Sequence, residues 1–198
     1  MGTQEWTDLY VILTAVCSAY LLYSIYRSHD RPLFLIFLAA VITNSLSYIV
    51  HLTGLGTSEL WFTWTSFLAI VFCICGLLVF IRNSKPVFAR FPLFLTALPL
   101  LSILFFPLVM RSLVINDLIN GIFQGGAIAS AVILFSLDHF SSKFREYFFS
   151  GMLLITAAFI YFWFILGNIT DYLPWLPAIL ANSGFLILTA GFYMRTKK

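Results

Sequence analysis

Uncharged polar side chains recur at helical spacing within otherwise apolar segments of this chain. Asn44, Tyr48 and His51 are four and three residues apart, so on a helix they share one face. Asn120 and Gln124 repeat the spacing in a second segment, and Asn182 lies near the middle of another. Such amide, phenol and imidazole groups donate and accept hydrogen bonds. They indicate a site for a small neutral or weakly polar solute, with the candidate ligand-binding residues Asn44, Tyr48, His51, Asn120, Gln124 and Asn182.

Seven apolar segments must position these residues. Each is close to the roughly 20 residues that a helix needs to cross about 30 Å of hydrocarbon, and none contains Asp, Glu, Lys or Arg. With 61% hydrophobic and 10% charged residues, the 198-residue chain leaves almost nothing for a soluble domain. We therefore predict an all-α polytopic membrane protein, a single integral membrane domain over residues 1–198 that forms a seven-transmembrane-helix bundle. The predicted helices are approximately 9–26, 33–52, 60–81, 92–110, 118–137, 147–166 and 173–194.

The basic residues alternate between the connections of these segments. Of the 11 Lys and Arg residues, ten follow the first, third, fifth and seventh segments. Arg111 alone falls in a connection on the same side of the membrane as the N-terminus. Cytoplasmic loops near helix ends collect Lys and Arg. The pattern predicts an N-terminus outside and a cytoplasmic C-terminus, as for a multi-pass protein of a bacterial inner (plasma) membrane. It also explains the net charge of +3 without a nucleic-acid partner.

The polar residues have two interpretations in this orientation. An amide without a partner is costly in hydrocarbon, so these groups are expected to face the inside of the bundle. There they could simply hydrogen-bond one helix to the next. Nearly all of them lie between the membrane midplane and the outer surface, however, and this asymmetry favours a pocket that opens outward.

No motif for covalent chemistry, a metal or a cofactor accompanies them. The last predicted helix holds no lysine for a retinal Schiff base, and neither GxxxxGK nor GxSxG occurs. Cys17, Cys73 and Cys75 lie within predicted helices and form no CxxC motif. We predict no catalytic residue, no metal site and no cofactor.

One strip of small residues indicates close packing. Gly121, Gly125 and Ala129 are four residues apart on the predicted helix 118–137. Such strips let helix backbones approach closely. Packing inside the bundle is the favoured use, and homo-oligomerisation is the competing one.

The fourth predicted helix differs from the others. It contains Pro92, Pro99 and Pro107 and few polar side chains, and proline bends a helix because it removes a backbone hydrogen bond. A bent apolar helix suits a peripheral linker. This suggests a 3+1+3 arrangement, in which two three-helix repeats flank the fourth helix.

Three functional classes remain. The favoured one is a facilitative transporter of a small neutral solute. The alternative is a sensor, a receptor-like protein or an accessory subunit that binds a ligand or a partner helix within the lipid bilayer. A membrane enzyme ranks third, because its acid–base pair would have to be His51 with Glu59 or Asp171 at the outer rim.

The orientation can be tested with single cysteines at Thr57 and Ser84, in a chain whose native cysteines have been replaced. Because these positions lie in connections on opposite sides, an impermeant thiol reagent should label the first in intact cells and the second only after permeabilisation. Equal labelling of both positions from outside would contradict the predicted orientation.

Overall fold

The computed structural model describes residues 3–29, 33–53, 58–84, 86–104, 113–137, 142–166 and 173–196. Within these ranges the chain is helical and has no strand. The long helices are α1 (Thr3–His29), α2 (Leu33–Thr53), α3 (Ser58–Ser84), α6 (Leu113–Leu137), α7 (Ser142–Ile160) and α8 (Leu176–Thr196). A π-helical segment, η2 (Tyr161–Leu166), extends α7. The prediction of an all-α chain is confirmed for the described residues.

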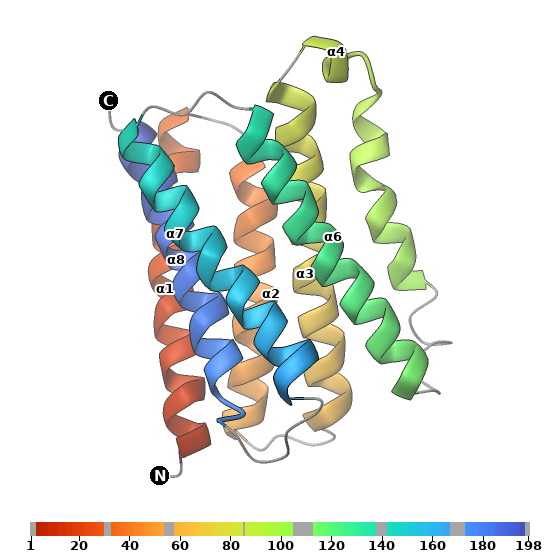
Figure 1. The fold of residues 1–198 in the computed structure, drawn as a ribbon, viewed down its shortest axis with the longest axis vertical. Coiled ribbons are helices and arrows are strands. Elements are labelled where there is room, and N and C mark those ends of the chain that lie inside the picture. The colour runs from red at the N-terminus through yellow and green to blue at the C-terminus, as the bar shows by residue number, and fades with distance from the viewer. Residues whose placement is uncertain are drawn as a thin grey trace.

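Six of these helical stretches are long and apolar enough to cross a membrane. Their axes lie roughly along the length of the molecule (Figure 1). Long apolar helices that satisfy their backbone hydrogen bonds internally are what a bilayer requires of a spanning segment. The described part of the chain therefore has the helices of a multi-pass membrane protein.

The predicted helix 92–110 is described only in its first part. Here Leu93–Leu101 forms a 3₁₀-helix, η1, and the helical path continues to Leu104. Pro99 lies inside η1 and has no N–H to donate. This stretch is shorter than a spanning helix, and residues 105–110 lie outside the described ranges. A seventh spanning helix is thus not confirmed.

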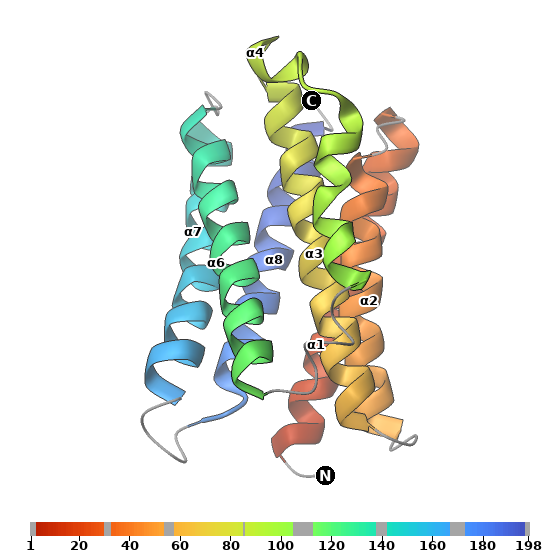
Figure 2. The same ribbon diagram turned by 90° about the vertical axis from the view of Figure 1, so that its right-hand side faces the viewer.

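The six long helices form a ring. In chain order α1, α2, α3, α6, α7 and α8 each pack against the next, and α8 packs against α1. Figure 2 shows α6 and α7 at one side of the bundle and α1 and α2 at the other. The short α4 (Pro86–Ala89) connects α3 to η1, and η1 packs on α3. We call the end at which α1 begins the N-terminal end of the bundle and the opposite end the C-terminal end (Figure 1).

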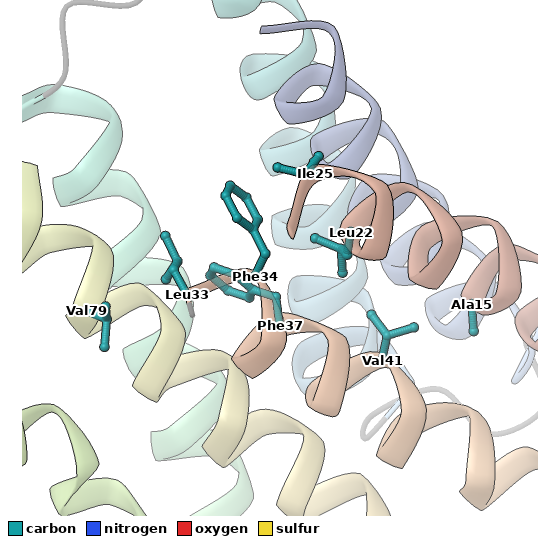
Figure 3. Close-up of a cluster of buried hydrophobic side chains, with 8 residues drawn as sticks. All are labelled: Ala15, Leu22, Ile25, Leu33, Phe34, Phe37, Val41 and Val79. Atoms are coloured by element: carbon teal, nitrogen blue, oxygen red, sulfur yellow. The ribbon is translucent and has the colours of Figure 1, made fainter. Parts of the chain in front are cut away.

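Aromatic and aliphatic side chains fill the C-terminal half of the bundle. Figure 3 shows buried residues of this core, among them Leu22 and Ile25 of α1 and Phe34 of α2. Phe192 of α8 is partly buried and packs against this core, with ring centroids 4.8 Å from Phe148, 5.6 Å from Phe80 and 6.2 Å from Phe34. All three pairs are edge-to-face, an arrangement worth about 0.5–1.5 kcal/mol per pair beyond area burial. Rings from four helices therefore close this half.

Among the glycines of the described helices, Gly151 of α7 and Gly184 of α8 come closest to a neighbouring backbone. A Cβ added at Gly184 would lie 2.6 Å from the carbonyl oxygen of Gly151, and one added at Gly151 would lie 2.8 Å from the carbonyl oxygen of Gly184. The predicted strip on α6 packs differently. A Cβ added at Gly121 would lie 3.5 Å from the ring of Trp163, and one added at Gly125 would lie 3.7 Å from the ring of Phe159. Side chains of the α7–η2 segment, rather than a neighbouring backbone, occupy the space that these glycines leave.

Replacing Gly184 by alanine should destabilise the protein, because the added methyl group meets a backbone carbonyl that cannot rotate away. Overpacking of this kind costs about 1–3 kcal/mol. Gly126→Ala is the matched control, since a Cβ there meets nothing within 4 Å. Thermal unfolding of the purified variants in detergent checks the difference, and a Gly184→Ala protein that melts at or above the control would contradict the packing described.

Candidate functional site

Polar side chains join α1, α2 and α8 in the N-terminal half of the bundle. In the described residues, each pair of these helices is linked by one polar contact between side chains. The contacts join Asp8 to His51, Tyr10 to Ser183 and Asn44 to Asn182. We call these six residues the three-helix polar network. It lies toward the opposite end from Phe34, Phe80, Phe148 and Phe192, which we call the phenylalanine core.

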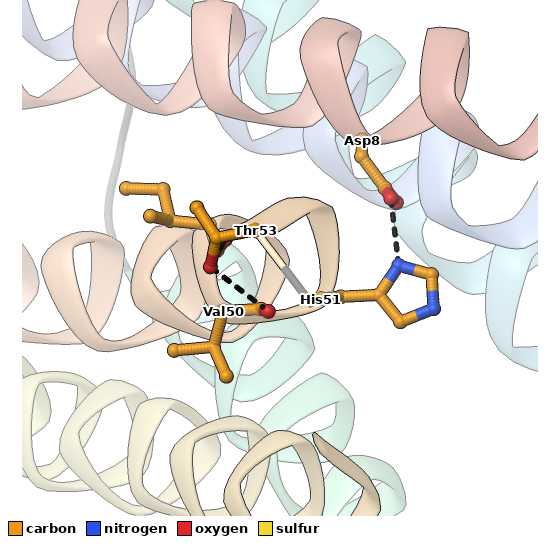
Figure 4. A network of polar contacts seen from close by, with 5 residues as sticks. Asp8, Val50, His51 and Thr53 are labelled. Carbon is orange, nitrogen blue, oxygen red and sulfur yellow. Dashed lines mark hydrogen bonds and ion pairs between the residues drawn. The ribbon is translucent and has the colours of Figure 1, made fainter. Parts of the chain in front are cut away.

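The contact between α1 and α2 is an ion pair or a charge-assisted hydrogen bond. His51 Nδ1 lies 2.7 Å from Asp8 Oδ2 (Figure 4). The Asp8 side chain is only 6% exposed, whereas that of His51 is 39% exposed. A buried carboxylate needs a hydrogen-bonding or charged partner, and His51 supplies it. The pair borders a cleft of about 320 Å³ that is also lined by Gln4, Glu5 and Leu52.

The other two contacts lie deeper along the helices. The hydroxyl groups of Tyr10 and Ser183 are 2.6 Å apart, and Ser183 also lies within 2.6 Å of the Ile179 carbonyl oxygen. Asn44 Nδ2 donates to Asn182 Oδ1 at 3.2 Å, while Asn182 Nδ2 donates to the Ala178 carbonyl at 2.9 Å. Both amides are half-buried. They tie α2 to α8 across the bundle.

Aromatic packing completes the α2 face. Tyr48 packs edge-to-face on Phe62 of α3, with ring centroids 5.5 Å apart, and His51 lies 6.2 Å from the same ring. Asn44, Tyr48 and His51 thus project from one side of α2, as their spacing predicts, although toward different neighbours. Asn44 faces α8, Tyr48 faces α3, and His51 contacts both α1 and α3.

The candidate residues on α6 form a separate group. Gln124 Oε1 accepts a hydrogen bond of 2.8 Å from Trp163 Nε1 in the π-helical segment η2. Asn120 is half-buried one turn earlier. Since α6 packs mainly against α3 and α7, Gln124 bonds to a residue of η2 and not to the residues of α2. The six candidate residues therefore divide between two neighbourhoods.

The predicted first helix, approximately 9–26, begins one residue after Asp8. α1 begins at Thr3, so Asp8 lies inside it and points toward α2. Asp8, Val11 and Thr14 follow one another at three-residue spacing and are all buried, so Asp8 lies on the face of α1 that packs inside the bundle. That periodicity continues through Ala15, Ser18, Leu22 and Ile25. The acids weighed as partners of His51 belong to other segments, and the side chain of Glu59 and all of Asp171 lie outside what the structure describes.

The chemistry available to the network follows from its groups. Among the described residues, no group of three or more His, Cys, Asp or Glu side chains is arranged to hold a metal ion. The amides and hydroxyls offer neutral hydrogen bonding, and the Asp8–His51 pair offers a place for one proton. No buried side-chain nitrogen or oxygen in the described ranges lacks a hydrogen-bond partner. Any solute would therefore exchange its hydrogen bonds for those already made between helices.

Comparison of the chain with protein-family models, with curated protein sequences and with solved structures gave no match. Its function is therefore inferred from the placement of its own side chains.

The contribution of the Asn44–Asn182 bond can be measured by a double-mutant cycle with alanine at both positions. Interhelical hydrogen bonds in membranes contribute about 0.6 kcal/mol on average and up to about 1.7 kcal/mol, so we expect a coupling energy in this range. Ser45→Ala combined with Asn182→Ala is the control, because the Ser45 hydroxyl donates to Ile42 of its own helix. A coupling equal to that of the control would mean that the amides do not hold α2 to α8.

Proposed function

We propose that this protein is a facilitative transporter of a small neutral or weakly polar solute, which enters at the N-terminal end of the bundle. The observation that carries the proposal is the division of the bundle interior into two unlike halves. The N-terminal half holds the three-helix polar network, whose Asp8–His51 pair borders a cleft, and the C-terminal half holds the phenylalanine rings around Phe192. In the orientation predicted from the basic residues, the polar half faces outward.

The polar half supplies the groups that a neutral solute needs. Asn44, Asn182, Tyr10 and Ser183 are each tied to another helix by a single side-chain bond. Such bonds contribute little net free energy in a membrane, so a solute that offers equivalent donors and acceptors can replace them at low cost. Tyr48 and Phe62 would provide an apolar wall above the amides.

The aromatic half supplies the barrier. Phe192 contacts rings from α2, α3 and α7, and these rings would stand between a solute held by the amides and the C-terminal end. Transport then requires these rings to separate after the polar half has closed. Movement of α8 would do both, because α8 carries Asn182 and Ser183 near one end and Phe192 near the other.

The arrangement of the ring is compatible with a 3+1+3 plan, which we include in the proposal. α1, α2 and α3 are consecutive in the ring, as are α6, α7 and α8, and η1 packs on α3. Each triplet would then be one repeat, with the pathway between the two. Transporters of this kind commonly place the substrate where repeats meet.

A sensor or accessory subunit is the second candidate, and one observation favours it. The amides already bond to each other or to Trp163, which is sufficient for structural cohesion without a solute. In that case a partner helix or a second copy of the chain would use the lipid side of α6, where Gly126 and Ala129 are exposed.

A thermal-shift screen of the purified protein against small solutes and lipids tests the transporter. A solute present at 100 times its Kd stabilises the native state by about 2.7 kcal/mol. Solutes that raise the melting temperature should also equilibrate faster into proteoliposomes than into empty vesicles, and uncouplers should not change that rate. Binding without flux would favour the sensor, and neither binding nor flux would overturn both ligand-based functions.

Adjacent phenylalanines on α7 allow a matched test of the barrier. Phe148 is 5% exposed and packs on Phe192, whereas Phe149 is 63% exposed toward lipid. Phe148→Ala should make solute flux faster and less selective because it opens a gap in the ring cluster, and Phe149→Ala should leave flux unchanged. Equal flux in the two variants would show that the phenylalanine core is not the barrier.

A further inference from the structure

We propose that the Asp8–His51 pair is a proton-operated latch between α1 and α2, placed at the N-terminal mouth of the bundle. With a proton on the imidazole, the pair is a closed contact between the two helices. When His51 loses that proton, the contact loosens and the polar network beneath it becomes accessible from the N-terminal side.

The geometry assigns different parts to the two residues. In the ionised form Asp8 can only accept hydrogen bonds, and in that form His51 Nδ1 carries the hydrogen in the 2.7 Å contact. The other ring nitrogen points away from Asp8 (Figure 4). His51 borders the cleft and is partly exposed, so it can exchange protons with water, whereas Asp8 is almost fully buried. The imidazole is thus the group that gains or loses the proton, and the carboxylate is the group that moves in response.

The surrounding charges leave His51 as the counter-ion of Asp8. The described arginines Arg27, Arg82, Arg90, Arg145 and Arg195 all lie at the C-terminal end of the bundle or just beyond it. Other titratable groups near the pair are Glu5 and Tyr10 on α1 and Tyr48 on α2, none of which brings a positive charge. Among the described side chains, the α3 residue that contacts His51 is Phe62 and the α8 residue that contacts Tyr10 is Ser183, and both are uncharged. Among the described residues, no other cation can replace the imidazolium.

The direction of the pH effect follows from this arrangement. Histidine is the side chain that ordinarily changes its charge between about pH 5 and 8. Protonated His51 and ionised Asp8 together carry no net charge, whereas loss of the proton leaves a buried carboxylate with only a neutral hydrogen bond. Because a buried anion without charge compensation is costly, Asp8 then gains by moving toward the cleft water. Proton binding closes the mouth, and a rise in pH opens it.

Ser47 is the residue that such an opening would expose. It precedes His51 by one helical turn, is 0% exposed, and donates to the Asn44 carbonyl at 2.6 Å. It therefore lies between the latch and the network amides. What the latch admits rests on the proposed function, but the opening itself can be measured without any solute.

The test uses Ser47→Cys in the full chain, with Cys17, Cys73 and Cys75 replaced by alanine. A small impermeant thiol reagent is applied from the N-terminal side, and the labelling rate is divided by that of Thr53→Cys in the same background. Thr53 is exposed at the end of α2, so the ratio corrects for the rise in thiol reactivity with pH that an accessible cysteine shows. Between about pH 5 and pH 8 we expect the ratio to rise by about fivefold or more, as for a coupling between linked sites.

Substitutions at position 51 separate charge from shape. His51→Lys keeps a positive charge throughout this pH range and should hold the ratio low at both ends. His51→Gln lacks the charge and should give a high ratio at both ends. His139→Gln, which removes a histidine outside the described residues, should behave like the parent. A ratio that does not change with pH in the parent, or a pH dependence that survives in His51→Gln, would overturn the latch.

This outcome is distinguishable from the fate of the proposed function. A pH-dependent ratio in a protein that neither binds nor moves any solute would support the latch and reject the transporter. Solute flux with a ratio that is constant with pH would support the transporter and reject the latch.

Discussion

One constraint shapes this molecule: a polar group inside an apolar helical bundle must find its partner on the chain itself. Neither lipid nor bulk water supplies hydrogen bonds there. Asp8 shows the constraint most strongly, because its buried carboxylate is matched by His51 on the next helix. The Tyr10–Ser183 and Asn44–Asn182 bonds obey the same rule. Together they define which faces of α1, α2 and α8 meet, a choice that apolar side chains make poorly when lipid is equally apolar.

The two ends of the bundle meet the packing problem in different ways. At the C-terminal end, rings from α2, α3, α7 and α8 interlock, and their shapes determine the fit. At the N-terminal end, directional polar contacts join α1, α2 and α8, and an apolar cluster around Phe67 packs α3 against α6. α8 contributes residues to both the polar contacts and the ring cluster. The close approach of Gly151 and Gly184 fixes its position against α7. A shift of α8 would therefore be felt at both ends.

The contacts that hold the N-terminal half together are also the ones best suited to change. An edge-to-face cluster of phenylalanines responds to neither pH nor a polar solute, whereas an imidazole–carboxylate pair responds to protons and an amide pair to competing hydrogen bonds. For this reason the same residues can both hold the helices together and respond to protons or a solute. The bonds between the helices must be weak enough to exchange if the interior is to admit anything.

Composition and periodicity alone predicted the helical class, seven spanning helices of which six are found as long apolar helices in the described residues, and the shared face of Asn44, Tyr48 and His51. These are local properties, because the length of an apolar run and a spacing of three or four residues act within one helix. Tertiary structure decided which helix each face meets. It paired Asp8 with His51, set Gln124 against Trp163 of η2, and filled the Gly121–Gly125 strip with aromatic rings. Periodicity defines a face but not its partner, because the rotation of each helix depends on how all of its neighbours pack.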